Sequence, residues 1–138
     1  MSPEKVPVVV DANILFSALL RPGNNFIATL TSERRFYVSE SVLAEIFRHK
    51  EKIVSAARLD QDELARAYHA ILMIVELYRE GLIPTACWEQ AAELCRGVDP
   101  NDAAPVALTL ALDGLLWTGD KALKAGLMAK GFDRFFTP

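Results

Sequence analysis

The sequence predicts a single α/β domain in which helices cover both faces of a largely parallel sheet. Short apolar runs at 6–10, 35–38 and 115–118 alternate with longer segments that have helical periodicity. The run Val8-Val9-Val10 carries no polar residue on either face, which is typical of a strand buried on both sides. No linker, repeat or low-complexity segment divides the 138 residues. We therefore expect one domain over residues 1–138.

Composition excludes several classes of protein. No apolar stretch is long enough to span a membrane and no signal-peptide layout opens the chain, so we expect a cytoplasmic protein with no membrane partner. Cys87 and Cys95 lack zinc-ligand spacing and are predicted to be reduced structural thiols. The net charge of −3 argues against a nucleic-acid binder that works by charge alone. It does not exclude an enzyme that acts on nucleic acid, because metal-binding carboxylates themselves lower the net charge.

The elements of the first half follow from local patterns. Residues 1–5 look like a flexible terminus, and the strand at 6–10 passes directly into a helix over 11–20. A Pro-Gly-Asn cluster then breaks the chain before a second helical segment at 26–30. After the strand at 35–38, Ser39 and Ser41 are candidate N-caps of a helix with apolar residues at Val42, Leu43, Ile46 and Phe47.

The second half continues the alternation of helices and short strands. A long helical stripe is predicted to end at Gly81, and a helix apolar nearly all round is predicted to be buried. In order we expect a helix over 60–80, a brief edge strand at 82–84, a helix over 88–96, a turn at 99–102, the buried helix over 103–112, a strand at 115–118, a helix over 120–130 and a last edge strand at 135–136.

Four acidic residues recur where strands end or helices begin. Asp11 and Asp120 each follow a predicted strand, and the carboxyl ends of parallel strands meet at one edge of a sheet. Glu45 lies about two helical turns after the second strand, and Asp102 opens the buried helix. Clustered carboxylates repel one another unless a cation is present, and Mg²⁺ or Mn²⁺ suits such an oxygen-rich site. Singly, each aspartate could equally be a helix N-cap, and Glu45 a solvated helix residue.

Several segments resemble, in order, the motifs of PIN-domain ribonucleases. They include Asp11-Ala12-Asn13 in the first segment, the single Glu45 in the second and Thr118-Gly119-Asp120 in the last. The resemblance covers residues 9–19, 41–46, 99–102, 107–111 and 115–123. It implies a three-layer fold in which a central, mostly parallel sheet of four to five short strands is flanked by helices.

The resemblance also implies metal-dependent hydrolysis of RNA phosphodiester bonds. Mg²⁺ or Mn²⁺ would activate water and stabilise charge on the phosphoryl group. No fifth acid follows Asp120 closely, and residues 50–98 match no motif, which leaves the choice of RNA open. By motif match, the catalytic and metal-site residues would be Asp11, Glu45, Asp102 and Asp120, the supporting residues Asn13 and Thr118, and Asp99 a neighbour whose alternative role is turn formation before Pro100.

The expected partners are RNA and a second protein chain. Arg48 and Lys50 are predicted to contact the RNA backbone, and Arg48 and His49 share a flank of their helix with Glu45. Many small domains of this family are toxins of toxin–antitoxin pairs. The apolar stripe from 64 to 78 is predicted to be chiefly core, and its length also allows an antitoxin or homodimer surface.

One alternative of another class stays open. The chain could be a catalytically weak PIN-like module that binds nucleic acid or protein. A haloacid-dehalogenase-type phosphatase is disfavoured, because that family needs a second acid two residues after the first and Asn13 stands there. Binding of a divalent metal would separate the nuclease from the binding module.

Overall fold

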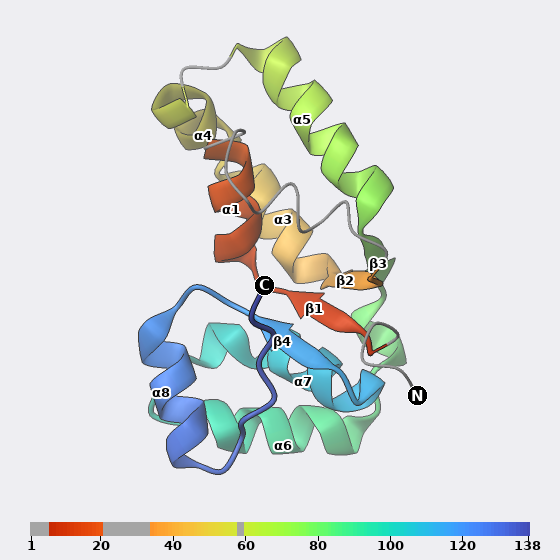
Figure 1. Cartoon of the computed structure of the whole chain (residues 1–138), viewed down its shortest axis with the longest axis vertical. Helices are drawn as coiled ribbons and strands as arrows, with labels where there is room; N and C mark the ends of the chain where they lie inside the picture. Colours follow the sequence, from red (N-terminus) through yellow and green to blue (C-terminus); the bar gives the residue numbers. More distant parts are fainter. Residues whose placement is uncertain (1–5, 21–33, 58–59) are drawn as a thin grey trace.

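A computed structural model describes residues 6–20, 34–57 and 60–138. The predicted terminus at 1–5 and the predicted helical segment at 26–30 lie outside the described residues. None of the helices within these ranges is long and apolar enough to cross a membrane. The described elements, labelled in Figure 1, are β1 (Val8–Val10), α1 (Ala12–Leu20), β2 (Phe36–Ser39), α3 (Glu40–Arg48), α4 (Lys50–Ala57), α5 (Gln61–Ile74), β3 (Glu76–Tyr78), the 3₁₀ turn η2 (Glu80–Leu82), α6 (Thr85–Cys95), the 3₁₀ turn η3 (Pro100–Asp102), α7 (Ala103–Leu112), β4 (Leu115–Trp117) and α8 (Lys121–Ala129).

The four strands form one parallel sheet in the order β3-β2-β1-β4. β1 lies between β2 and β4, so Val8 pairs with both Phe36 and Leu115, and Val10 pairs with Trp117. The predicted sheet of four to five mostly parallel strands is confirmed. Because all strands run the same way, the loops that follow β1, β2 and β4 leave the sheet at the same edge.

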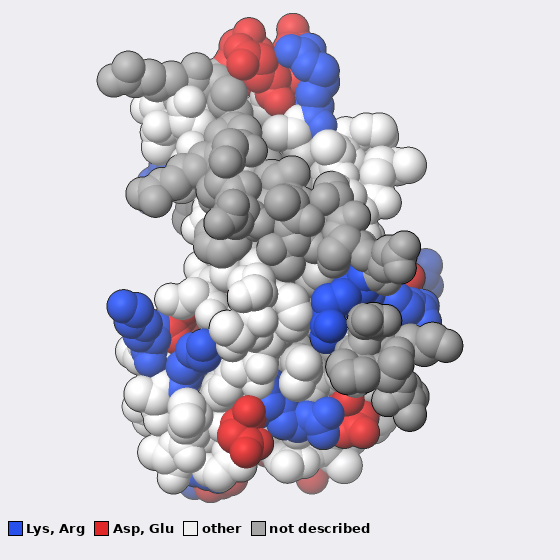
Figure 2. Space-filling view, in the orientation of Figure 1, with Lys and Arg blue, Asp and Glu red and all other residues white. Residues whose placement is uncertain are grey.

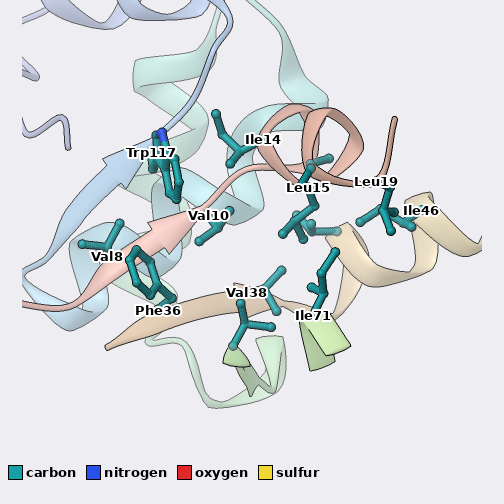
Figure 3. Close-up of a cluster of buried hydrophobic side chains, with 14 of the residues drawn as sticks. Val8, Val10, Ile14, Leu15, Leu19, Phe36, Val38, Ile46, Ile71 and Trp117 are labelled. Atoms are coloured by element: carbon teal, nitrogen blue, oxygen red, sulfur yellow. The ribbon is translucent and has the colours of Figure 1, made fainter. Parts of the chain in front are cut away.

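Helices cover both faces of this sheet and make the fold three-layered (Figure 1). Alternate side chains of a strand point to opposite faces, so Val8 and Val10 join one core while Val9 joins the other. The first core contains side chains of α1, α3, α4 and α5, and Figure 3 shows Leu15, Ile46 and Ile71 gathered around β1 and β2. The second contains side chains of α6, α7 and α8. The valine run is fully buried, as its composition predicts.

The helix predicted to be buried is α7, whose residues from Ala104 to Thr109 are all buried. It packs between α6 and the strands β1, β2 and β4. Pro105 falls in its first turn, where a missing N–H does little harm, and the Thr109 hydroxyl donates to the Pro105 carbonyl at 2.8 Å. An all-apolar helix suits this position because each of its sides meets protein.

Three predicted elements differ from the structure. The helix predicted over 60–80 ends at Ile74, and Glu76–Tyr78 form strand β3 beside β2. The edge strand predicted at 82–84 is absent from the described fold, and Gly81 lies inside η2 instead of ending a helix. The strand predicted at 135–136 is reduced to a single bridge between Phe135 and Leu116. In each case a long-range pairing, or its absence, overrides the local pattern.

Candidate active site

The carboxyl edge of the sheet brings Asp11 next to Thr118. Asp11 directly follows β1 and Thr118 directly follows β4, and the Asp11 backbone N–H donates to the Trp117 carbonyl at 3.0 Å. Parallel pairing of the two strands therefore fixes the distance between residues that are 107 positions apart. The polar cluster at this edge begins with these two side chains.

The Asp11 carboxylate is buried, with 4% of the residue exposed, and is held by three hydrogen bonds. Its Oδ1 accepts from the backbone N–H of Ala12 at 2.8 Å. Its Oδ2 accepts from the Thr118 hydroxyl at 2.9 Å and from the Asn13 amide at 3.2 Å. Asn13 in turn accepts from the Gly119 N–H at 2.8 Å. Asn13 and Thr118 thus hold Asp11 and tie the loop after β1 to the loop after β4.

The surroundings of Asp11 raise the pKa of its carboxyl group above the usual value. Burial is the largest cause, and the charges of Glu45 and Asp120 act in the same direction. The hydrogen bonds from Thr118 and Ala12 lower the pKa and offset part of this effect. A cation nearby would lower this pKa and so favour the ionised carboxylate.

Asp102 differs from an ordinary helix cap. It stands at the N-cap position of α7, yet its side chain accepts no hydrogen bond from the helix. Its Oδ2 is buried and has no hydrogen-bond partner among the described residues. Burial, followed by the charges of Asp11, Asp99, Asp120 and Glu45, raises the pKa of Asp102 to about 7. A buried carboxylate oxygen left without a donor is a position where a cation would relieve the cost of burial.

Three of the four predicted acids line one pocket of about 340 Å³. Asp11 comes from the end of β1, Glu45 from α3 and Asp102 from the start of α7. Asp120 does not line this pocket, and its carboxylate caps α8 by accepting from the Leu123 N–H at 3.0 Å. Its charge nevertheless raises the pKa of both Asp11 and Asp102, so it lies beside the other acids.

The donor set fits a hard divalent cation. In the described part of the chain, no three acidic, histidine or cysteine side chains converge closely enough to form a ready-made metal cluster. Mutual repulsion holds carboxylates apart when no cation neutralises them. The unpaired oxygen of Asp102 and the raised pKa values of Asp11 and Asp102 are features that a bound cation would compensate. Carboxylate oxygens are the ligands that Mg²⁺ and Mn²⁺ prefer.

The remaining predicted residues divide between the pocket and its surroundings. Arg48 lines the pocket. Lys50 does not, and its ammonium lies 4.5 Å from the centre of the Phe47 ring. The Asp99 side chain accepts from the Asn101 N–H at 3.0 Å, which is the turn role that the sequence left open for it.

Sequence reasoning did not assign two other polar residues of this pocket, Ser41 and Asn101, to the site. A signal for Ser41 was available, because it precedes Glu45 by one helical turn and so shares its face. Asn101 directly precedes Asp102 in the predicted turn. Both supply neutral polar groups to a pocket otherwise lined by acids, Arg48 and His49, with the apolar Val42 and Pro105.

Comparison with known proteins identifies the fold and the family of this chain. No curated protein sequence gives a significant match. A chain of the crystal structure of VapBC2 from Rickettsia felis, bound to a DNA fragment from their promoter, is similar to this chain with a TM-score of 0.69 and 15% sequence identity. The likeness covers 86% of this chain and 92% of that chain, and at this identity it shows the shared fold. The sequence model of the PIN domain matches residues 9–136, which contain all four acids. The chain therefore belongs to the PIN domain family.

Proposed function

We propose that this protein is a metal-dependent endoribonuclease that hydrolyses RNA phosphodiester bonds at the acidic pocket. The observation that carries the proposal is the buried, unpaired Oδ2 of Asp102 in a pocket shared with Asp11 and Glu45. A capping role does not explain that oxygen, because the Asp102 side chain makes no cap. Membership of the PIN domain family supports a nuclease in general.

The chain's own residues would hold the metal and orient its ligands. Asp11, Glu45 and Asp102, which come from three different elements, would hold Mg²⁺ or Mn²⁺ in the pocket, with Asp120 adding negative charge beside them. Mg²⁺ or Mn²⁺, when bound, supplies the positive charge that favours attack by water and stabilises charge on the phosphoryl oxygens. Asn13 and Thr118 would keep the Asp11 carboxylate in a single orientation through their hydrogen bonds.

Replacement of Asp11 by asparagine tests the proposal. We expect Asp11→Asn to fold, because the amide is nearly isosteric, and to lose at least 100-fold of the Mg²⁺-dependent cleavage of single-stranded RNA. Asp133→Asn is the matched control. It removes one exposed acid that belongs to none of the four predicted site positions, and it should cleave like the wild type. Cleavage by Asp11→Asn at the wild-type rate would refute the metal-site assignment.

A catalytically weak binding module is the second candidate. It is favoured by the absence of a ready-made three-ligand cluster among the described residues. A binding module would bind RNA or protein equally well with Mn²⁺ or with EDTA and would not cleave. The same assays therefore separate the two functions.

We further propose that the protein is the toxin of a toxin–antitoxin pair acting in the cytoplasm. The similar solved structure is a VapBC2 complex bound to promoter DNA. An apolar groove of about 460 Å³ lies between α3, α4 and α5, and Phe47 on its rim is 60% exposed. The two cysteines are free, as suits a reducing compartment. A small protein encoded beside this gene should form a complex with it and stop RNA cleavage; if no neighbouring product inhibits cleavage, the toxin assignment fails and the nuclease assignment stands.

A further inference from the structure

Two nitrogen-containing side chains at the end of α3, those of Arg48 and His49, line the acidic pocket. Arg48 and His49 follow Glu45 by three and four residues, so all three lie on one helix face. All three line the pocket that also contains Asp11 and Asp102. One wall of the pocket is therefore acidic and the adjoining edge carries nitrogen donors.

His49 is held in place by the helix that follows Asp11. Its ring centroid lies 5.9 Å from that of Phe16 in α1, with the two rings tilted by 58°. The residue is half-buried, and its ring nitrogens make no hydrogen bond to another described residue. The imidazole thus packs against Phe16, and its nitrogens have no partner among the described residues that would compete with a ligand at the pocket.

Arg48 is exposed and likewise unengaged. Its guanidinium forms no ion pair or hydrogen bond within the described ranges, not even with Glu45 one turn earlier. The planar guanidinium presents donors in a fork that matches the oxygens of a phosphate. An arginine that has no partner among the described residues and lines an acidic pocket is suited to an anionic ligand that the acids alone would repel.

Two observations favour contact of an anionic ligand with Arg48 and His49 alone over binding to a broad basic surface. Lys50 is turned to the Phe47 ring and lines the apolar groove instead of the acidic pocket. Figure 2 shows, over the described residues of the face in view, small mixed groups of acidic and basic side chains and no continuous basic patch. A phosphate at the acidic pocket would therefore meet Arg48 and not Lys50.

We infer that Arg48 and His49 together bind a phosphate of the RNA strand next to the bond that is cut, and that Lys50 does not take part. The inference rests on the proposed nuclease function and adds to it the residues that seat the substrate. The metal would hold the scissile phosphate over the acids, while Arg48 supplies charge and His49 a hydrogen bond to its neighbour in the strand. Phe16 would act as a positioning residue, because it touches His49 and not the RNA.

RNA binding by the full-length chain tests this assignment. Each variant is combined with Asp11→Asn to prevent cleavage, and binding of a fluorescent single-stranded RNA is followed by anisotropy in Mn²⁺ at several salt concentrations. We expect Arg48→Ala to weaken binding about fivefold to tenfold and to lower the salt slope by about 0.7. His49→Ala should weaken binding about threefold or more, and His49→Gln, which keeps a donor, should restore much of that loss.

Two further variants keep the test specific. Arg66→Ala removes one positive charge from the exposed surface of α5 and should bind within twofold of the parent. Lys50→Ala should resemble Arg66→Ala. The inference is overturned if Arg48→Ala and His49→Ala bind like the parent, or if Lys50→Ala weakens binding as much as Arg48→Ala does.

Kinetics in the chain with Asp11 intact give an independent readout. Arg48→Ala and His49→Ala should raise KM for RNA while kcat changes by less than about threefold. A fall in kcat at unchanged KM would assign these residues to the chemical step and overturn the binding role. If the wild type does not cleave RNA, the proposed function fails, but the anisotropy series still decides whether this wall binds a phosphate.

Discussion

The buried carboxylate of Asp11 and the half-buried carboxylate of Asp102 have opposite hydrogen-bond environments. The oxygens of Asp11 accept three hydrogen bonds, whereas the Oδ2 of Asp102 accepts none from the described residues. Asp11 is therefore oriented by the protein, and Asp102 is left to a ligand. The environment of Asp11 predicts the effect of a Thr118 variant, and that of Asp102 predicts a pH dependence of stability.

Thr118 should matter for activity more than another buried threonine does. Thr118→Val keeps the shape but removes the donor to Asp11, at a cost of about 1–2 kcal/mol in the free energy of unfolding. It should also lower RNA cleavage at least tenfold, because Asp11 loses its fixed orientation. The matched control is Thr109→Val in α7, which removes a hydroxyl that donates to the Pro105 carbonyl, away from Asp11. Equal cleavage by the two variants would contradict a positioning role for Thr118.

In the metal-free protein, the contribution of Asp102 to the free energy of unfolding should fall as the pH rises from about 4 to about 7. Folding raises the pKa of Asp102 from its usual value of 3.8 to about 7, so the folded state binds more protons than the unfolded state in this window. The stabilisation is complete below pH 3.8 and is lost as the pH passes through 7. A full shift of this size corresponds to about 4 kcal/mol, and partial solvent access reduces it to about 1–2 kcal/mol.

Asp102→Asn provides the control for this pH dependence. In EDTA the variant should be more stable than the wild type at pH 8, and the difference should vanish near pH 4, because the amide cannot ionise. Urea denaturation across this range measures both curves. Parallel curves for the two proteins would show that Asp102 does not titrate with a raised pKa.

Among the elements, the close contact between β1 and the turn before β4 determines where Asp11 and Thr118 meet. The Leu115 N–H donates to the Pro7 carbonyl at 2.9 Å, which starts the pairing of the two strands. Gly114 sits against the same carbonyl, because a Cβ at this position would lie 2.5 Å from the Pro7 oxygen. The turn thus needs glycine for space.

Gly114→Ala should destabilise the fold and displace the site together with β4. The added methyl group must push Pro7 away or break the first hydrogen bond of the strand pair, at a cost of about 1–3 kcal/mol by urea denaturation. Gly81→Ala is the control, because a Cβ there meets nothing within 4 Å, and its effect should stay within about 0.5 kcal/mol. Equal stabilities would mean that the turn before β4 can move without disturbing the sheet.

At the scale of the whole molecule, the site brings together residues from the two halves of the chain. Asp11 and Glu45 come from the first half, and Asp102 and Asp120 come from the second. A metal that bound all of them would link the two helical layers of Figure 1 across the sheet edge. Metal binding should therefore stabilise the entire fold.

Addition of Mn²⁺ to EDTA-treated protein should raise the Tm. A ligand at 100 times its Kd stabilises the folded state by about 2.7 kcal/mol, which is on the order of 5–10 °C for a domain of this size. Thermal denaturation of Asp102→Asn should show less than half of this shift, and that of the control Asp133→Asn should show all of it. No shift in the wild type would favour the binding module over the nuclease.

The elements with the strongest local patterns could be predicted from sequence. The valine run predicted β1, and with it the placement of Asp11 directly after the strand, and the segment that is apolar nearly all round predicted α7. β3 could not be predicted, because Val75 and Tyr78 continue the apolar spacing of α5. It becomes a strand only by pairing with β2, where Tyr37 meets Glu76 and Ser39 meets Tyr78.

The sequence by itself therefore determined the fold class, the family resemblance and the identity of the four acids, because these depend on residue type and order along the chain. The tertiary structure decided how those acids are arranged. It placed Asp11, Glu45 and Asp102 in one pocket, turned the Asp120 carboxylate to the start of α8, and separated Arg48 from Lys50. Burial, hydrogen bonding and pKa depend on neighbours brought from distant parts of the chain, and no local pattern contains them.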